Sequence, residues 1–297
     1  MKYALLLMVS IGLVTLLNSC GNAGYERNSD GLIYKIYHTG KGEKVKPNSF
    51  LKIHQIVKIG DSLFFDSFGK VPTYGFFDSV TSPKHDFLDI LDRMSVGDSA
   101  IVIRSIDTLA KRRVIQLNET FKKGGTLKIT LKVIGVFDSE QAMNNDYKEE
   151  MEKYKKAELA ELEKYAEGTK AQNLSKTPEG VLVSIEREGK GPKVDSGMHV
   201  KVNYTGRLLN GTVFDSNVDS TFGHPNAFEF NVGGHEVIAG WDIGILKLNA
   251  GAKAKFFIPS MLGYGVQGSG QKIPPYSNLV FDIEVLEAKH GDSTLMK

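Results

Sequence analysis

The chain has 297 residues, which is enough for about two ordinary domains, and it is 41% hydrophobic and 24% charged, a common globular mixture. The formal net charge is +2, so neither a nucleic-acid partner nor strong adhesion to an acidic membrane surface is expected. Cys20 is the only cysteine, which excludes an internal disulfide and a cysteine-rich metal cluster.

The N-terminus has the layout of a secretory signal. Lys2 precedes an apolar run from Tyr3 to Leu17, which is too short to span a bilayer comfortably. Residues 17–20 read LNSC and resemble the bacterial lipobox, in which cleavage occurs before a cysteine that carries a diacylglyceryl group. We therefore predict a lipoprotein signal peptide over residues 1–19 and a lipid on Cys20. An ordinary signal peptide and an N-terminal anchor helix are the alternatives.

The lipid prediction also gives a location. A lipid on Cys20 would tether the mature protein to a membrane on the periplasmic side of a bacterial cell, and Gly21 carries no obvious signal for retention at the inner membrane. The outer membrane is therefore favoured. Residues 20–30 are polar and show no periodicity, so we expect a flexible leash between the lipid and the fold.

The rest of the chain contains an internal repeat. Residues 31–42 read GLIYKIYHTGKG and residues 180–191 read GVLVSIEREGKG, while Phe-Asp-Ser occurs both at 65–67 and at 214–216. We interpret residues 31–137 and 176–290 as two copies of one domain, here called the N-terminal copy and the C-terminal copy. Alternating apolar and polar residues in each copy predict an antiparallel sheet with one solvated face.

A helical linker is expected between the copies, over residues 138–175. Asp146 and Glu149 resemble a capping box, and Gly168 suits a helix end. Spacing of apolar side chains over residues 146–167 gives a loose stripe, which consists of Tyr147, Met151, Tyr154, Leu162 and Tyr165. The helix is either a spacer or, through this stripe, the contact of a homodimer.

Other motifs carry no chemistry. Residues 263–268 satisfy the G-x-G-x-x-G pattern, but Pro274 and Pro275 follow and prevent the helix that a dinucleotide site requires. The seven histidines are scattered, and no pair has metal-ligand spacing. We therefore expect no metal and no cofactor.

The C-terminal copy resembles a known family over its whole length. The matching stretches are VNYTG at 202–206, FDS at 214–216, FEF at 228–230, VIAGW at 237–241, LGYG at 262–265, IPP at 273–275 and LVFD at 279–282. In this order they resemble the FKBP-type peptidyl-prolyl cis-trans isomerases. The resemblance implies an α+β fold of two FKBP-like domains joined by the long linker helix, each a curved antiparallel sheet wrapped over a short helix. In the C-terminal copy, that helix would begin near Val237 and Ile238.

The resemblance also implies a site between helix and sheet. Its catalytic residues would be Tyr204, Phe214, Asp215, Trp241, Tyr264 and Phe281. Its substrate-binding residues would be Phe228, Val237, Ile238 and Ile273. In this arrangement Trp241 forms the floor of an apolar pocket, and the backbone N–H of Ile238 is available to a substrate carbonyl.

Such residues suit a reaction in which no bond is made or broken. The peptide bond before a proline rotates through a twisted state over a barrier of about 18–20 kcal/mol. Water stabilises the charge-separated planar amide, so an apolar pocket should favour the twisted form. The resemblance thus implies an isomerase that assists the folding of proline-containing polypeptides outside the cytoplasm, and it implies tacrolimus-like macrolides as ligands. The alternative is a holding chaperone that binds chains without catalysis.

The chain departs from the family pattern both in a loop of the C-terminal copy and in the N-terminal copy. The stretch from Asp215 to Phe228 is long and lacks the arginine that often pairs with the pocket aspartate. In the N-terminal copy, Gln55 stands where the pocket tyrosine is expected, Phe87 in place of Trp241, and Ile129 in place of Phe281. We therefore expect the N-terminal copy to be a degenerate domain without an active pocket.

Overall fold

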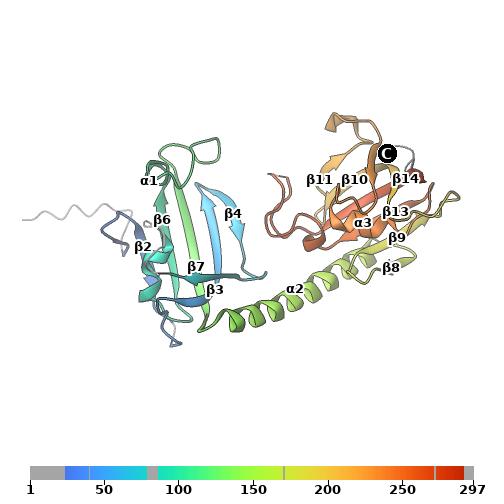
Figure 1. The fold of residues 1–297 in the computed structure, drawn as a ribbon. Coiled ribbons are helices and arrows are strands. Elements are labelled where there is room, and N and C mark those ends of the chain that lie inside the picture. The colour runs from blue at the N-terminus through green and yellow to red at the C-terminus, as the bar shows by residue number, and fades with distance from the viewer. Residues whose placement is uncertain (1–23, 40, 79–85, 170, 271, 291–297) are drawn as a thin grey trace, which may run out of the picture. The chain divides into compact units, whose positions relative to one another are not determined.

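A computed structural model describes residues 24–39, 41–78, 86–169, 171–270 and 272–290 (Figure 1). The predicted signal peptide and Cys20 lie outside this part of the chain. The chain divides into two compact units, one with most of the first sheet and the other with residues 50–56, 65–76 and everything from Phe137 on. None of the described helices is both long and apolar enough to cross a membrane.

The second sheet belongs to the C-terminal copy. Its order is β8-β9-β13-β14-β10-β11, with β12 also paired to β10, and these neighbouring strands run antiparallel. The strands are β8 (Leu174–Lys176), β9 (Leu182–Arg187), β10 (Met198–Leu208), β11 (Val213–Ser216), β12 (Phe228–Asn231), β13 (Lys253–Ile258) and β14 (Leu279–His290).

The first sheet repeats this topology strand for strand. Its order is β1-β2-β6-β7-β3-β4, with β5 also paired to β3. The strands are β1 (Glu26–Arg27), β2 (Ile33–Tyr37), β3 (Ser49–Ile59), β4 (Ser62–Asp66), β5 (Thr73–Phe77), β6 (Ser99–Ser105) and β7 (Thr126–Phe137). The shared order confirms the predicted α+β fold of two related domains.

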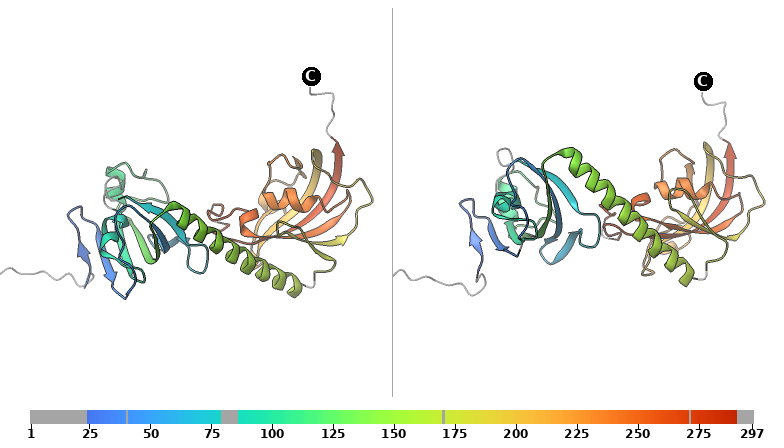
Figure 2. Two further views of the ribbon diagram at one scale, coloured as in Figure 1. Left: turned by 60° about the horizontal axis from the view of Figure 1, so that its bottom comes forward. Right: turned by 90° about the horizontal axis from the view of Figure 1, so that it is seen from below.

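One short helix covers the inner face of the second sheet. α3 (Ala239–Ile245) begins after Ile238, as expected, and Figure 2 shows it seated against the strands. A Cβ atom on Gly240 would lie 2.3 Å from Ile258, and one on Gly244 would lie 2.8 Å from Phe256. Two glycines four residues apart thus let the helix backbone approach β13 more closely than any other residue would allow.

The outer face of the same sheet is covered by the linker helix. α2 (Glu140–Gly168) buries Leu162 and Ala166 completely against Leu182, Phe257 and Val280, which come from three neighbouring strands. The prediction of one solvated face is therefore wrong at these strands. Consecutive apolar residues such as Phe256 and Phe257 point to opposite faces, and each is buried against a different helix.

The linker helix begins earlier than the capping box predicted, whereas its end at Gly168 is as predicted. It is capped by Ser139, whose hydroxyl accepts from the N–H of Ala142, so Asp146 lies inside the helix rather than at its cap. The helix ends at Gly168, and Leu174 already belongs to β8, so the linker is helical over a shorter span than residues 138–175. The helix begins after Ser139 rather than after Asp146 because serine is a strong N-cap residue. The acidic Glu140 in the first turn also favours this start.

The apolar stripe of α2 is largely used within the chain. Tyr154 contacts Tyr276 at 5.5 Å between ring centroids, and Tyr165 contacts Phe257 at 6.2 Å. Leu162 is fully buried. Tyr147 also contacts a ring of the same chain, that of Tyr74, at 5.4 Å between centroids. A dimer contact through this stripe would therefore have to use Met151 and the exposed part of Tyr147.

The predicted leash over residues 20–30 is ordered in its second half. Glu26 pairs with Tyr34, and Arg27 with Ile33, in an antiparallel bridge. The Tyr34 hydroxyl donates to the Glu26 carboxylate over 2.7 Å. The short segment thus adds an edge strand to the first sheet, and the leash prediction is wrong for these residues.

The helical segments of the two copies lie between corresponding strands. A 3-10 helix, η1 (Phe87–Arg93), precedes β6, and α1 (Ile106–Lys111) follows it. In the C-terminal copy the corresponding turns are α3 before β13 and the single 3-10 turn η3 (Ser260–Leu262) after it. A further 3-10 turn, η2 (Ser220–Phe222), lies in the long loop between β11 and β12.

The docking of α2 should contribute measurably to stability. We expect Leu162→Ala to lower the free energy of unfolding by about 2–5 kcal/mol, because it removes a fully buried side chain and leaves a cavity. Urea unfolding followed by fluorescence of Trp241, the only tryptophan, would report on the C-terminal copy. Leu286→Ala, at a side chain 43% exposed on β14, is the matched control and should change little. Equal effects of the two changes would contradict the packing described.

Candidate functional site

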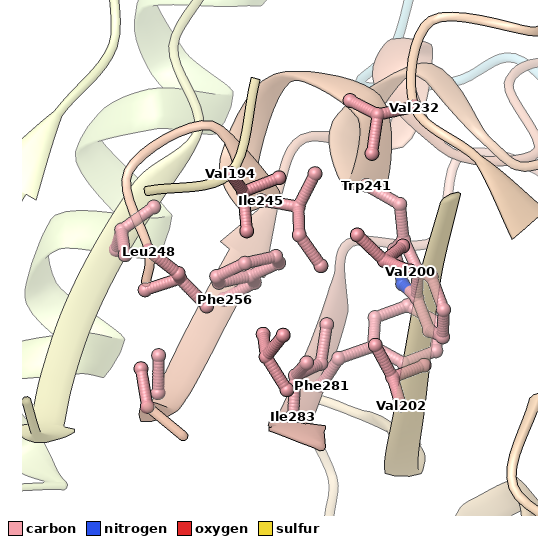
Figure 3. Close-up of a cluster of buried hydrophobic side chains, with 14 of the residues drawn as sticks. Val194, Val200, Val202, Val232, Trp241, Ile245, Leu248, Phe256, Phe281 and Ile283 are labelled. Carbon is pink, nitrogen blue, oxygen red and sulfur yellow. The ribbon is translucent and has the colours of Figure 1, made fainter. Parts of the chain in front are cut away.

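Trp241 is the centre of an aromatic cluster on the inner face of the second sheet. Its side chain is only 4% exposed. The ring centroids of Tyr204 and Phe281 lie 5.1 Å from that of Trp241, both in edge-to-face geometry, and those of Phe228 and Phe230 lie at 6.1 and 5.8 Å. Figure 3 shows Trp241 and Phe281 among the buried valines of β10. Edge-to-face pairs of this kind favour one fixed arrangement of rings.

The cluster extends to Phe214 through Phe281, whose ring centroids are 5.6 Å apart. Gly206 of β10 makes this possible. A Cβ atom there would lie 2.6 Å from the ring of Phe281 and 2.7 Å from that of Phe214. The glycine of the VNYTG stretch is therefore required because two aromatic rings cross its backbone.

The cluster is buried at one side and open at the other. Trp241, Phe214 and Phe281 are at most 5% exposed, whereas Phe228 and Tyr264 are each 38% exposed. Val237 and Ile238 are partly buried against the same core, and Ile273 is buried in it. The structure thus brings together all the side chains that the sequence assigned to the site.

Three polar groups lie at the open side, the hydroxyls of Tyr204 and Tyr264 and the carboxyl group of Asp215. The Tyr204 hydroxyl donates to Oδ2 of Asp215 over 2.7 Å. Burial, and then the hydrogen bond to Asp215, raises the pKa of Tyr204 well above its usual value. Burial and the charge of Asp215 likewise raise the pKa of Tyr264. Both phenols therefore stay protonated at neutral pH and remain hydrogen-bond donors.

The partner of Asp215 is a residue that sequence reasoning missed. Nε2 of His224 lies 2.8 Å from Oδ1 of Asp215, so this histidine takes the position expected of the absent arginine. His224 and Asp215 are both partly exposed, and a pair of this kind contributes modestly to stability because water screens it. No local pattern marks His224, since it lies nine residues away in a loop without periodicity.

The long loop between β11 and β12 is tied back to the cluster. Asn217 is buried, and its side chain accepts from the N–H of Tyr204 and donates to the carbonyl of Val202. Nζ of Lys272 donates to the carbonyl of Phe214 and lies 5.0 Å from the ring centroid of Phe222. The loop is thus anchored on both sides of Asp215.

The site offers apolar surface and shape, with hydrogen-bonding groups at its rim. Within the described ranges, no three histidine, cysteine, aspartate or glutamate side chains come together to hold a metal ion. The indole N–H of Trp241 is buried and has no acceptor among these residues. The arrangement can desolvate a small apolar group and donate hydrogen bonds at its rim.

Comparison with known proteins agrees with this geometry. The model of the FKBP-type peptidyl-prolyl cis-trans isomerase family matches residues 191–286. A probable FKBP-type peptidyl-prolyl cis-trans isomerase of Haemophilus influenzae is 33% identical over 221 residues, which cover 73% of this chain and 84% of that protein. FK506-binding protein 2 of Dictyostelium discoideum is 52% identical over 94 residues, which cover 32% of this chain and 68% of that protein.

A solved structure was also found. The crystal structure of FkpA from Escherichia coli has 31% sequence identity and a TM-score of 0.39, and the match covers 51% of this chain and 70% of that one. The assignment of the chain to a family rests on the relative from Haemophilus influenzae and on the family model, and it does not use this solved structure. The chain belongs to the FKBP-type peptidyl-prolyl cis-trans isomerases and is an isomerase of peptide bonds that precede proline.

Proposed function

We propose that the aromatic cluster around Trp241 is the isomerisation site of this enzyme. The observation that supports this is the edge-to-face arrangement of Tyr204 and Phe281 on the buried indole, with Asp215 and Tyr264 at the open side. A proline ring placed on Trp241 would be held by apolar surface alone. The polar groups at the rim would then meet the flanking peptide.

The chemistry follows from the environment of the amide. Resonance makes the planar amide charge-separated, and the twisted amide is less polar. Because the cluster withholds water, it destabilises the planar form more than the twisted one. Aromatic side chains that fit the twisted proline bind the transition state better than the substrate, which is the requirement for catalysis.

Rim groups would orient the substrate rather than react with it. The Tyr264 hydroxyl and the backbone N–H of Ile238 are donors for substrate carbonyls, and Asp215 is held by Tyr204 and His224. No proton leaves or arrives during rotation. Side chains from Val237 and Ile273 would complete the apolar surface around the proline.

We propose proline-containing polypeptides that fold outside the cytoplasm as the substrates. A macrolide of the tacrolimus type is an expected inhibitor, since relatives named FK506-binding proteins are 52% and 43% identical to this chain over 94 and 110 residues. The protein would act from the periplasmic side of a bacterial membrane, favouring the outer membrane, held by a lipid on Cys20. The LNSC stretch supports this location.

Changes in the cluster should reduce catalysis. We expect Trp241→Leu to lower kcat/KM at least tenfold, a loss of about 1.4 kcal/mol of transition-state stabilisation. Tyr264→Phe should lower it about threefold to tenfold, because one hydrogen bond is lost. The measurement is the rate of cis-to-trans conversion of a proline peptide by the purified full chain, with and without tacrolimus.

Phe76→Leu, at an aromatic side chain 50% exposed in the N-terminal copy, is the control and should leave kcat/KM unchanged. Each variant is checked for folding by circular dichroism. Full activity in a folded Trp241→Leu protein would contradict the proposed site. Suppression of client aggregation that survives both changes would assign holding of chains to a different surface.

The lipid is tested separately. In bacteria fed a radiolabelled fatty acid, the wild-type chain should carry label and partition into detergent, since stable anchoring needs more than one acyl chain. Cys20→Ser should carry no label and remain as an unprocessed precursor. An unlabelled wild-type protein that is nevertheless processed would point to an ordinary signal peptide instead.

A further inference from the structure

The linker helix places a carboxyl group directly behind the loop that carries Tyr264. Glu158 of α2 is only 4% exposed and lies one helical turn before Leu162, on the face that packs on the second sheet. Its Oε1 accepts two hydrogen bonds, from the backbone N–H of Ser260 and from the Tyr154 hydroxyl, each over 3.0 Å. The contact joins residues 102 positions apart.

Ser260 begins the 3-10 turn η3, and this turn has no cap of its own. Pro259 occupies the cap position and makes no side-chain hydrogen bond to the turn. The fully buried Ser260 N–H is instead satisfied from outside, by Glu158 and by Oδ1 of Asn278 at 3.1 Å. Nδ2 of Asn278 in turn donates to Glu161, also on α2. Two glutamates of the linker helix thus hold the start of η3, Glu158 directly and Glu161 through Asn278.

The carbonyl of Ser260 connects η3 to the loop that carries Tyr264. It accepts from the N–H of Gly263 over 3.0 Å and from that of Gly265 over 2.8 Å. These two residues flank Tyr264. The carbonyl of Gly265 then accepts from the N–H of Tyr276, which closes the loop on its far side. A shift of Ser260 would therefore move the backbone on which the Tyr264 side chain stands.

Burying this carboxyl group is costly. Oε2 of Glu158 is buried and has no hydrogen-bond partner among the described residues. Burial raises the pKa of Glu158, and the nearby Glu161 raises it further, although the bonds from Ser260 and Tyr154 act in the opposite direction. An apolar side chain at such a place commonly serves stability as well or better. The hydrogen bond to Ser260 is what an apolar side chain could not supply.

We propose that Glu158 is a positioning residue of the isomerase, which caps the turn η3 from the linker helix and thereby fixes Tyr264 at the rim of the site. The inference rests on the role proposed above for Tyr264. It assigns α2 a part in catalysis beyond that of a spacer. Glu158 itself does not touch the substrate.

The test compares three variants of the full chain with the wild type. Glu158→Leu removes the acceptor and should lower kcat/KM about fivefold to tenfold, the equivalent of one hydrogen bond. Glu158→Gln keeps an acceptor oxygen and should stay within about twofold of the wild type. Tyr165→Leu loosens the same helix through its contact with Phe257 but keeps the hydrogen bond from Ser260 to Glu158, so it should lower the melting temperature without lowering kcat/KM.

A second measurement follows the tether, that is, the hydrogen bond from Ser260 to Glu158 and the loop it holds. Amide hydrogen exchange at Gly263 and Gly265 should accelerate in Glu158→Leu and stay slow in Glu158→Gln and Tyr165→Leu. If Glu158→Leu does not fold, Glu158→Asp, which withdraws the acceptor by one methylene, should show both effects. Assays run well below the melting temperature of every variant.

The outcomes separate the two proposals. Activity of Glu158→Leu within twofold of the wild type, or an equal loss in Tyr165→Leu, would overturn the positioning role. A wild-type level of activity in Tyr264→Phe would instead remove the role of Tyr264, while faster exchange at Gly263 and Gly265 in Glu158→Leu would still establish the tether.

Discussion

The close approach of α3 to β13 is the constraint on which the site depends. Gly240 and Gly244 leave no side chain between the helix and the strand, so Ile258 and Phe256 pack against the helix backbone. This depth places the indole of Trp241 within 5.1 Å of two aromatic rings. A larger residue at either glycine would raise the helix and separate the indole from the rings. The floor of the site is thus set by residues that contribute no chemistry.

Burial on both faces of the second sheet gives the site its rigidity. Phe256 and Phe281 face α3, while their neighbours Phe257 and Val280 face α2. Each strand is therefore held from two sides, and protein interiors packed in this way resist small displacements. A site that acts by shape and desolvation needs such a support, because its effect depends on the fit of the twisted proline rather than on a reactive group.

The aromatic residues of the site could be predicted from the sequence because each lies in a short stretch that resembles the family. Trp241 lies in VIAGW, Tyr204 in VNYTG and Phe281 in LVFD. The same reasoning missed Glu158, since a glutamate in a charged helix looks like part of a solvated face. It also did not predict that α2 packs on Phe257 and Val280, because an apolar run in the sequence does not show which element buries the second face of the strand. Contacts between distant segments carry no local signal.

The two copies show how one missing hydroxyl changes a site. In the C-terminal copy, Asp215 accepts from the Tyr204 hydroxyl and faces the aromatic cluster. In the N-terminal copy, Gln55 takes the place of that tyrosine, and its amide donates to Thr73. Asp66, the counterpart of Asp215, accepts from the N–H of Phe68 in a local turn. Without a phenol to bind, the carboxylate is used to close a loop.

The segment after the sixth strand of each copy, β13 or β6, shows the same dependence for the backbone. After β13 the chain forms a single 3-10 turn and then the loop with Tyr264, held by hydrogen bonds to the Ser260 carbonyl. After β6 it forms α1, capped by its own Ser105 and buried through Ile106 and Leu109. The N–H of Ile106 is bonded to the carbonyl of Gly125 in the same copy, and the helix presents no tyrosine. The C-terminal copy keeps an extended loop at this place, and that loop depends on a carboxylate from another element for its first hydrogen bond.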